Sequence, residues 1–259
     1  MNILEKIYEY KKEELAHFKR TLRPEDLKAK IRDLDRKPLD FAQALREPPA
    51  DFAVIAEMKQ RSPSKGLLRE VFEPETIARD YVAARAAALS VLTDEHFFGG
   101  HLDHLRRVRR IAAIPLLRKD FIWDPYQIHA AFEAGADAIL LIVAMLPKNQ
   151  LEDLQGIARE LGLGVLVEVH DAAECEIAGA IDASLVGVNN RDLKSFRVDT
   201  AVTEALLPRL PVQALKISES GLDSKATLTR LKNLGVNAFL IGEALMKAKN
   251  PGTALEKFW

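Results

Sequence analysis

Eight short runs of aliphatic and β-branched residues alternate, from about residue 53 onward, with segments whose apolar residues recur at three and four positions. A short continuous apolar run indicates a buried strand, and the spacing of three and four indicates one face of a helix. Several predicted helices end at glycine, as at Gly135, Gly162 and Gly235, because glycine is preferred just past a helix end. The predicted strands span residues 53–59, 89–93, 115–120, 138–143, 164–169, 185–190, 214–220 and 238–243.

This succession predicts an α/β fold, a single (β/α)8 TIM barrel with a last helix over residues 251–258. The strand ends are spaced too evenly for a doubly wound sheet, which contains a reversal point. The length of 259 residues is near that of one such barrel, and no internal linker divides the chain. We therefore assign residues 51–259 to one barrel domain.

Residues 1–50 precede the first strand and are predicted to form an N-terminal helical extension. Ile3, Ile7 and either Tyr10 or Lys11 mark one helical face, and residues 40–46 read as a second short helix. Two placements remain open for the extension. It caps the bottom of the barrel, or it covers the mouth of the active site.

Composition and net charge limit the kinds of ligand and partner that we expect for the chain. Hydrophobic residues make up 48% and charged residues 29%, the balance of a soluble globular protein. The net charge of −1 gives no general attraction to nucleic acid or to an anionic membrane, so we expect a small-molecule ligand bound at a local site. The apolar run 138–146 is too short to span a bilayer, and no signal peptide is evident, which predicts a cytoplasmic protein. A monomer or weak homo-oligomer is expected.

Polar residues stand at the ends of most predicted strands, where (β/α)8 barrels place their functional groups. Glu57 and Lys59 end the first strand two positions apart and therefore face the same side. Burying several opposite charges around one axis is costly unless each is compensated, and folds tolerate it mainly where acid–base chemistry needs it. The other strand-end residues are Lys119, Glu168, Asn189, Arg191, Glu219 and Ser220.

The last two strands predict a phosphate cradle. Ser220-Gly221 and Ile241-Gly242-Glu243 follow them, and glycine allows backbone N–H groups to approach an anion closely. Either glycine alone would be an ordinary turn, whereas the pair favours phosphate. The loop after the first strand, residues 61–66, is polar and is interpreted as a mobile lid that contributes Ser62.

Other motifs argue against a cofactor or a metal. Walker, Rossmann, His-Glu-x-x-His and Cys-x-x-Cys patterns are absent from the sequence. His101 and His104 lack an evident third ligand and are expected to face solvent, as are the arginines of 106–110. The single cysteine, Cys175, lies in a polar helical segment and is expected to be inert.

Long blocks of the chain resemble the indole-3-glycerol-phosphate synthase family. The blocks AVIAEMKQRSPSKG, LSVLTDEHFFGG, PLLRKDFIWDPYQI, GADAILLIVA, LVEVHD, VGVNNRDLKSF, SESG and GVNAFLIGEALM occur in that family's order and spacing. The resemblance runs from about Phe41 to Met246, and the first 40 residues match loosely. It implies ring closure, decarboxylation and dehydration of 1-(2-carboxyphenylamino)-1-deoxyribulose 5-phosphate.

The resemblance also implies individual roles. The lysine matching Lys119 protonates the sugar carbonyl, the one matching Lys59 pairs with the substrate carboxylate, and the glutamate matching Glu168 is the base of dehydration. Positions matching Glu57 and Asn189 orient these groups. Residues matching Phe98, Phe121 and Leu140 pack on the aromatic ring, and those matching Ser62, Ser220, Gly221, Gly242 and Glu243 surround the phosphate. Arg191, Glu219 and Ile241 complete the predicted substrate site.

A lysine that gives up a proton near neutral pH needs a lowered pKa, and a neighbouring cation lowers it. We therefore expect Lys59 to lower the pKa of Lys119. Three positions depart from the family pattern. Arg85 replaces an expected glycine, Trp123 an expected small aliphatic residue, and Glu243 stands where a small residue suits phosphate better, so that only its backbone should face the anion.

Two alternatives remain open. A related phosphate-binding isomerase would need a Cys/Asp pair, but Cys175 is not at a strand end. A non-catalytic or repurposed barrel would be expected to have lost some of the charged strand-end residues, yet Glu57, Lys59, Lys119 and Glu168 all stand.

Overall fold

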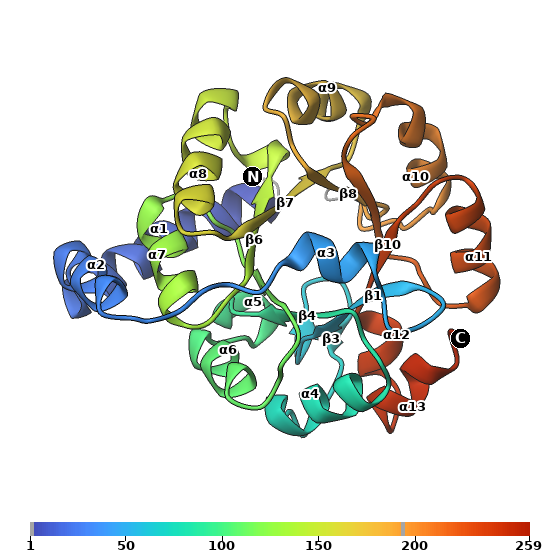
Figure 1. The fold of residues 1–259 in the computed structure, drawn as a ribbon, viewed down its shortest axis with the longest axis horizontal. Coiled ribbons are helices and arrows are strands. Elements are labelled where there is room, and N and C mark those ends of the chain that lie inside the picture. Colours follow the sequence, from blue (N-terminus) through green and yellow to red (C-terminus); the bar gives the residue numbers. More distant parts are fainter. Residues whose placement is uncertain (1–2, 193–194) are drawn as a thin grey trace.

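The computed structural model describes residues 3–192 and 195–259, with the side chains of Ile3 and Glu5 outside the described part. The described residues form a closed barrel of eight parallel strands in the order β1-β10-β9-β8-β7-β6-β5-β4 (Figure 1). Each predicted strand is confirmed, most with ends one or two residues shorter. The strands are β1 (Ala53–Met58), β4 (Ala88–Leu92), β5 (Leu116–Lys119), β6 (Ala138–Ile142), β7 (Gly164–Val169), β8 (Leu185–Asn189), β9 (Leu215–Glu219) and β10 (Ala238–Ile241).

Helices surround the barrel on the outside (Figure 1). Many begin at a side chain that caps the first turn, such as Asp124 before α7 and Asp171 before α9. The outer helices are α4 (Pro74–Ala83), α6 (Leu102–Arg109), α7 (Pro125–Glu133), α8 (Lys148–Glu160), α9 (Ala172–Ala180), α10 (Ala201–Leu206), α11 (Lys225–Asn233) and α13 (Pro251–Glu256). Two short helices, α5 (Glu95–Phe98) and α12 (Glu243–Met246), follow β4 and β10 at the ends that face the site.

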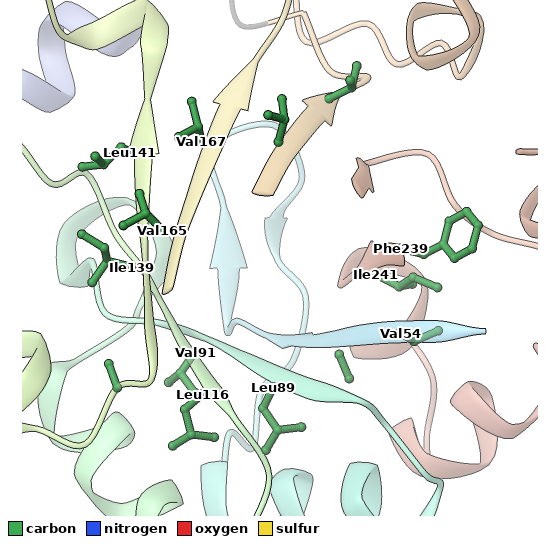
Figure 2. Close-up of a cluster of buried hydrophobic side chains, with 14 of the residues drawn as sticks. Val54, Leu89, Val91, Leu116, Ile139, Leu141, Val165, Val167, Phe239 and Ile241 are labelled. Atoms are coloured by element: carbon green, nitrogen blue, oxygen red, sulfur yellow. The ribbon is translucent and has the colours of Figure 1, made fainter. Parts of the chain in front are cut away.

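Alternation along the strands builds two apolar layers. One set of side chains packs between the barrel and the helices, and Figure 2 shows Val54, Leu89, Ile139 and Phe239 among it. The other set fills the barrel interior and includes Ile55, Leu117, Leu140, Leu166, Ile217 and Leu240. The charged residues at the strand ends lie above this apolar interior, where a (β/α)8 barrel places its functional groups.

The N-terminal extension occupies both ends of the barrel. Helix α3 (Phe41–Arg46) lies over the barrel centre and packs Phe41 and Leu45 against the starts of the strands, so it closes the bottom (Figure 1). Helix α1 (Ile3–Thr21) instead brings Ile7 to the cavity at the opposite end, and α2 (Pro24–Arg32) packs on α7. Each of the two placements left open by the sequence is therefore correct for one helix.

Two departures from the family pattern have local explanations. Arg85 has a φ of 61°, the left-handed conformation that glycine adopts most easily, so the arginine pays a backbone penalty there. Trp123 packs edge-on against Tyr8 of α1, with ring centroids 5.2 Å apart. The larger side chain at 123 thus tightens the contact between α1 and the loop after β5.

The loop after β1, which the sequence predicts to be a lid, contains regular structure. It forms a two-stranded antiparallel hairpin of β2 (Arg61–Ser62) and β3 (Gly66–Leu67). Within the described ranges, no helix is long and apolar enough to cross a membrane.

Candidate active site

A cavity of about 580 Å³ opens at the carboxyl ends of the barrel strands. Its size falls within the range of small-molecule sites. Every site residue predicted from the sequence lines it, from all eight strands or the loops after them: Glu57, Lys59, Ser62, Phe98, Lys119, Phe121, Leu140, Glu168, Asn189, Arg191, Glu219, Ser220, Gly221, Ile241, Gly242 and Glu243.

Lys119 lies at the centre of this group, at the end of β5. Its Nζ donates a hydrogen bond of 2.8 Å to Glu168 Oε2 and lies 3.3 Å from Glu219 Oε2. Burial alone would lower the pKa of Lys119, but the carboxylates, Glu168 foremost, outweigh it and raise that pKa well above its ordinary value. The expectation of a lowered pKa at Lys119 is therefore wrong for the unliganded site, because three buried glutamates surround the ammonium.

Glu168 is the better compensated of the two carboxylates at Lys119. Asn189 Nδ2 donates to its Oε1 at 3.1 Å, and His170 Nε2 lies 3.3 Å from the same oxygen. Burial raises the pKa of Glu168, yet Lys119 and His170 outweigh it and hold the pKa well below its usual range. Glu168 thus stands ionised at neutral pH.

Glu219 behaves in the opposite way. Its Oε1 is buried and has no hydrogen-bond partner among the described residues. Burial, together with the charges of Glu168 and Glu57, raises the pKa of Glu219 to about 7 against the pull of Lys119. The pKa values of two neighbouring carboxylates are therefore pushed apart, the condition in which acid and base roles separate.

Glu57 and Lys59 form an ion pair at the end of β1, as their two-residue spacing predicts. Glu57 is buried, and its side chain lies against Gly242 at the start of α12. A Cβ at position 242 would fall on Glu57 Oε1. The glycine is needed for this close approach and not for its φ, which is −128°.

The end of the cavity for which the sequence predicts a phosphate cradle combines turns and cations. Ser220 and Gly221 both have positive φ, 67° and 74°, and Asn190 Nδ2 donates to the Ser220 carbonyl at 3.0 Å. The Arg191 guanidinium donates to Ser64 Oγ at 3.2 Å and to Glu243 Oε2 at 3.1 Å.

The side chain of Glu243 is held by two cations at this end of the cavity. It accepts from Lys247 Nζ at 2.6 Å as well as from Arg191. Burial raises its pKa, but these two cations outweigh burial and lower it. The carboxylate therefore occupies donors that an incoming anion could use.

The opposite end of the cavity is apolar. Phe98 from α5 and Phe121 after β5 have ring centroids 6.0 Å apart, and Leu140 of β6 lines the same space. Asp94 fixes the start of α5 by accepting from Phe97 N at 2.7 Å and Phe98 N at 3.2 Å. These contacts form a wall suited to a planar ring.

A buried ionic network beside the site was missed by the sequence reasoning. Lys11 of α1 is 1% exposed, whereas Tyr10 is 38% exposed, so Lys11 is the residue on the buried face. Its Nζ lies 2.9 Å from Asp120 Oδ1 and also pairs with Glu14. Asp120 in turn accepts from Thr93 Oγ1 at 2.5 Å and, on the same oxygen, from Arg118. Asp120 directly follows Lys119, so the network ties α1 to the segment that carries the central lysine.

The remaining candidates lie outside the cavity. Cys175 is buried in α9, and burial raises the pKa of its thiol to about 11, which agrees with an inert residue. The isomerase alternative, which needs a cysteine in the cavity, is therefore not supported. His101 pairs with Glu95 at 3.1 Å on the surface, but His104 is half-buried against Phe72, so the expectation of two solvent-facing histidines holds for His101 alone.

The arginines of α6 do not form a purely solvated face, because they pair with carboxylates of neighbouring segments. Arg106 donates to Glu133 at 2.7 Å, Arg107 to Glu75 at 2.6 Å, and the half-buried Arg109 to the buried Asp137 at 2.7 Å. They hold the outer helices together.

Comparison with known proteins gives one consistent family. The family model described as "Indole-3-glycerol phosphate synthase" matches residues 4–258. Proteins of that name are similar to the chain in Variovorax paradoxus (48% identity over 262 residues, 98% of this chain and 97% of the relative) and in Campylobacter jejuni (45% over 254 residues, 98% of both). A thiamine phosphate pyrophosphorylase structure from Pyrococcus furiosus is similar in fold, with a TM-score of 0.58 at 17% identity over 80% of this chain and 93% of that one.

Proposed function

The chain belongs to the indole-3-glycerol phosphate synthase family, and from its carboxy-lyase reaction in tryptophan biosynthesis we propose how the cavity residues share the chemistry. The reaction closes a ring on a sugar carbonyl, releases CO2 and then releases water. Its substrate, 1-(2-carboxyphenylamino)-1-deoxyribulose 5-phosphate, has an aromatic ring with a carboxylate at one end and a phosphate at the other. The cavity offers matching surfaces at its two ends.

In the proposal, the substrate lies across the strand ends. Its ring packs on Phe98, Phe121 and Leu140, and its phosphate meets the backbone at Ser220, Gly221, Gly242 and Glu243 near Ser62 and Arg191. Lys59 pairs with the ring carboxylate, and Glu57 holds that lysine in place through their ion pair. Ile241 closes the wall between the two ends.

Lys119 is the proposed general acid of ring closure. As the ring carbon attacks the carbonyl carbon, the carbonyl oxygen takes a proton from Lys119 Nζ, and the carboxylate then leaves the ring carbon as CO2. Glu168 accepts a proton from the sugar CH2 carbon beside the hydroxyl-bearing carbon, a double bond forms between these two carbons, and the hydroxyl leaves as water with a proton taken up from solvent. Asn189 and Glu219 orient the groups around Glu168. The observation that carries this assignment is the contact of 2.8 Å between Lys119 and Glu168 inside the cavity.

We also propose that residues 1–50 are an accessory layer on a catalytic barrel of residues 51–259. Contacts from both ends of the extension support it, since α1 borders the cavity and α3 closes the barrel bottom. The proposal further includes a cytoplasmic enzyme that works as a monomer or a weak homo-oligomer.

The assignment is tested by following the fluorescence of the indole product with the Glu168→Gln variant. The variant keeps the shape of the side chain but loses the base, so kcat should fall by roughly 10²–10⁴-fold. Glu176→Gln, on the exposed face of α9, is the matched control and should keep the parent rate. A Glu168→Gln rate within about tenfold of the parent would show that another group removes the proton.

A further inference from the structure

His170 stands directly behind the proposed base. It follows Glu168 by two residues at the end of β7, and its Nε2 lies 3.3 Å from Glu168 Oε1. His170 does not line the cavity, and its side chain is 14% exposed. It can therefore act on the reaction only through Glu168.

The first turn of α9 holds the imidazole in place. Glu174 N donates to Asp171 Oδ1 at 2.9 Å, which anchors that turn. The Glu174 side chain reaches back, where its Oε2 accepts from His170 N at 2.6 Å and lies 3.1 Å from His170 Nδ1. The imidazole is thus fixed between Glu174 on one side and Glu168 on the other.

Both ring nitrogens face ionisable carboxylates. An ionised carboxylate only accepts hydrogen bonds, so this arrangement favours a proton on each nitrogen. Burial lowers the pKa of His170, but Glu168 and Glu174 outweigh burial and raise it to about 10. His170 is therefore a fixed cation at neutral pH.

The Nε2 atom of His170 has no hydrogen-bond partner among the described residues. Nε2 is buried, and no hydrogen bond with good geometry reaches it from the described residues. Glu168 instead receives Lys119 on Oε2 and Asn189 on Oε1. A small rotation would let His170 donate to Glu168 once the contact with Lys119 is released.

We propose that His170, held by Glu174, is a positioning residue that keeps Glu168 ionised and oriented while Lys119 gives its proton to the substrate. This inference rests on the proposed roles of Lys119 and Glu168. When Lys119 donates its proton it becomes a neutral amine, and Glu168 loses the cation nearest to it. A carboxylate buried beside other carboxylates would then tend to take up a proton and could no longer act as a base. The charge of His170 prevents that.

The charged groups around Glu168 come from several strands. Lys119 lies on β5 and Glu219 on β9. The charge of Glu57 on β1 shifts the pKa values of both Lys119 and Glu219. Around His170 the charged groups are Glu168 and Glu174. Once Lys119 is neutral, removing His170 leaves Asn189 as the hydrogen-bond donor to Glu168 among the described residues, and the pKa of Glu168 should rise.

The kinetic test is the pH dependence of kcat for His170→Gln. The acidic limb of the profile should move upward by about one pH unit or more, since a cation within hydrogen-bonding distance lowers a carboxyl pKa by roughly that amount. The loss of kcat should grow as the pH falls and disappear at high pH, with KM little changed. Glu174→Gln should move the limb the same way by less, and His129→Gln, on α7 outside the cavity, should not move it.

A second measurement does not depend on catalysis. The imidazole of His170, followed by NMR, should stay protonated to about pH 10 in the parent, and Glu168→Gln should shift its titration downward. Titration near the ordinary value of 6.5 in the parent, or a His170→Gln profile parallel to the parent's, would overturn the inference. An active Glu168→Gln enzyme together with the expected shift would instead overturn the proposed base and leave the His170–Glu168 coupling standing.

Discussion

Lys119 Nζ and Glu168 Oε2 are joined by a hydrogen bond of 2.8 Å inside the cavity. The proposed acid and the proposed base are thus direct neighbours. A proton that Glu168 takes from the substrate during dehydration can return along this bond to the Lys119 amine that lost one during ring closure. This return restores both side chains, while the proton that lets the hydroxyl leave as water is taken up from solvent, because loss of CO2 from a carboxylate consumes one proton overall.

We expect Glu219 to lower the free energy of unfolding as the pH rises. Its pKa is about 7 in the folded chain against 4.5 as the ordinary value, so the folded state holds a proton that the unfolded state releases. The stability linked to this proton is fully present below about pH 4.5 and is lost as the pH rises through 7. Glu219→Gln stays neutral at every pH, so at pH 8 its unfolding free energy should exceed the parent's by on the order of 3 kcal/mol.

Urea unfolding of both proteins at pH 5 and pH 8 checks this. The difference should be small at pH 5, and Glu176→Gln should show none of it. A difference that is equal at the two pH values would mean that Glu219 does not titrate in this range.

Lys11 is expected to be essential for stability. Lys11→Met removes the cation that faces Asp120, Glu14 and Asp94 and leaves buried carboxylates uncompensated. Breaking a buried ion pair in this way typically costs about 3–5 kcal/mol. Lys12→Met, one residue along on the exposed side of α1, is the matched control and should stay within about 0.5 kcal/mol of the parent.

Thermal or urea unfolding of the two variants gives the comparison. Adding Glu14→Gln to Lys11→Met should recover part of the loss, because the Glu14 carboxylate loses its ion-pair partner Lys11, whereas Asp120 keeps its contact with Arg118. Equal stabilities for Lys11→Met and Lys12→Met would show that the network does not hold α1 on the barrel.

Gly242→Val should damage both binding and chemistry. Its Cβ would fall on Glu57 Oε1, so the side chain crowds the phosphate end and displaces the partner of Lys59 as well. KM should rise strongly and kcat should fall, and inhibition by inorganic phosphate should weaken. Gly156→Val, at a helix position with open space around it, should change none of these. An unchanged KM for Gly242→Val would refute the phosphate cradle.

The sequence predicted those features that follow from local periodicity. Strand alternation placed Glu57 and Lys59 on one face, and the glycine pairs marked the turns at 221 and 242. Arg85 was identified only as a departure from an expected glycine, and its left-handed backbone, with a φ of 61°, was not predicted.

Features that depend on contacts between distant segments were not predicted. The sequence left open whether Tyr10 or Lys11 lies on the packed face of the first helix, and it gave no sign that Asp120 would be the partner of Lys11. The pKa of Lys119 was predicted in the wrong direction because its sign depends on how many carboxylates surround it in space, and Glu219 completes that set. For His170, the signal was its position two residues after Glu168 and four before Glu174, which gains meaning only once the start of α9 is placed.

The central claim, that Lys119 delivers the proton of ring closure while Lys59 anchors the carboxylate, is tested most directly by steady-state kinetics of Lys119→Met and Lys59→Met. Lys119→Met should lower kcat by roughly 10²–10⁴-fold, or about 3–5 kcal/mol of barrier, with little change in KM, because the lost interaction belongs to the transition state. Lys59→Met should show a larger share of its loss in KM, and Lys148→Met on the exposed side of α8 should resemble the parent. A Lys119→Met kcat within about tenfold of the parent, or the reverse partition between the two variants, would contradict the account.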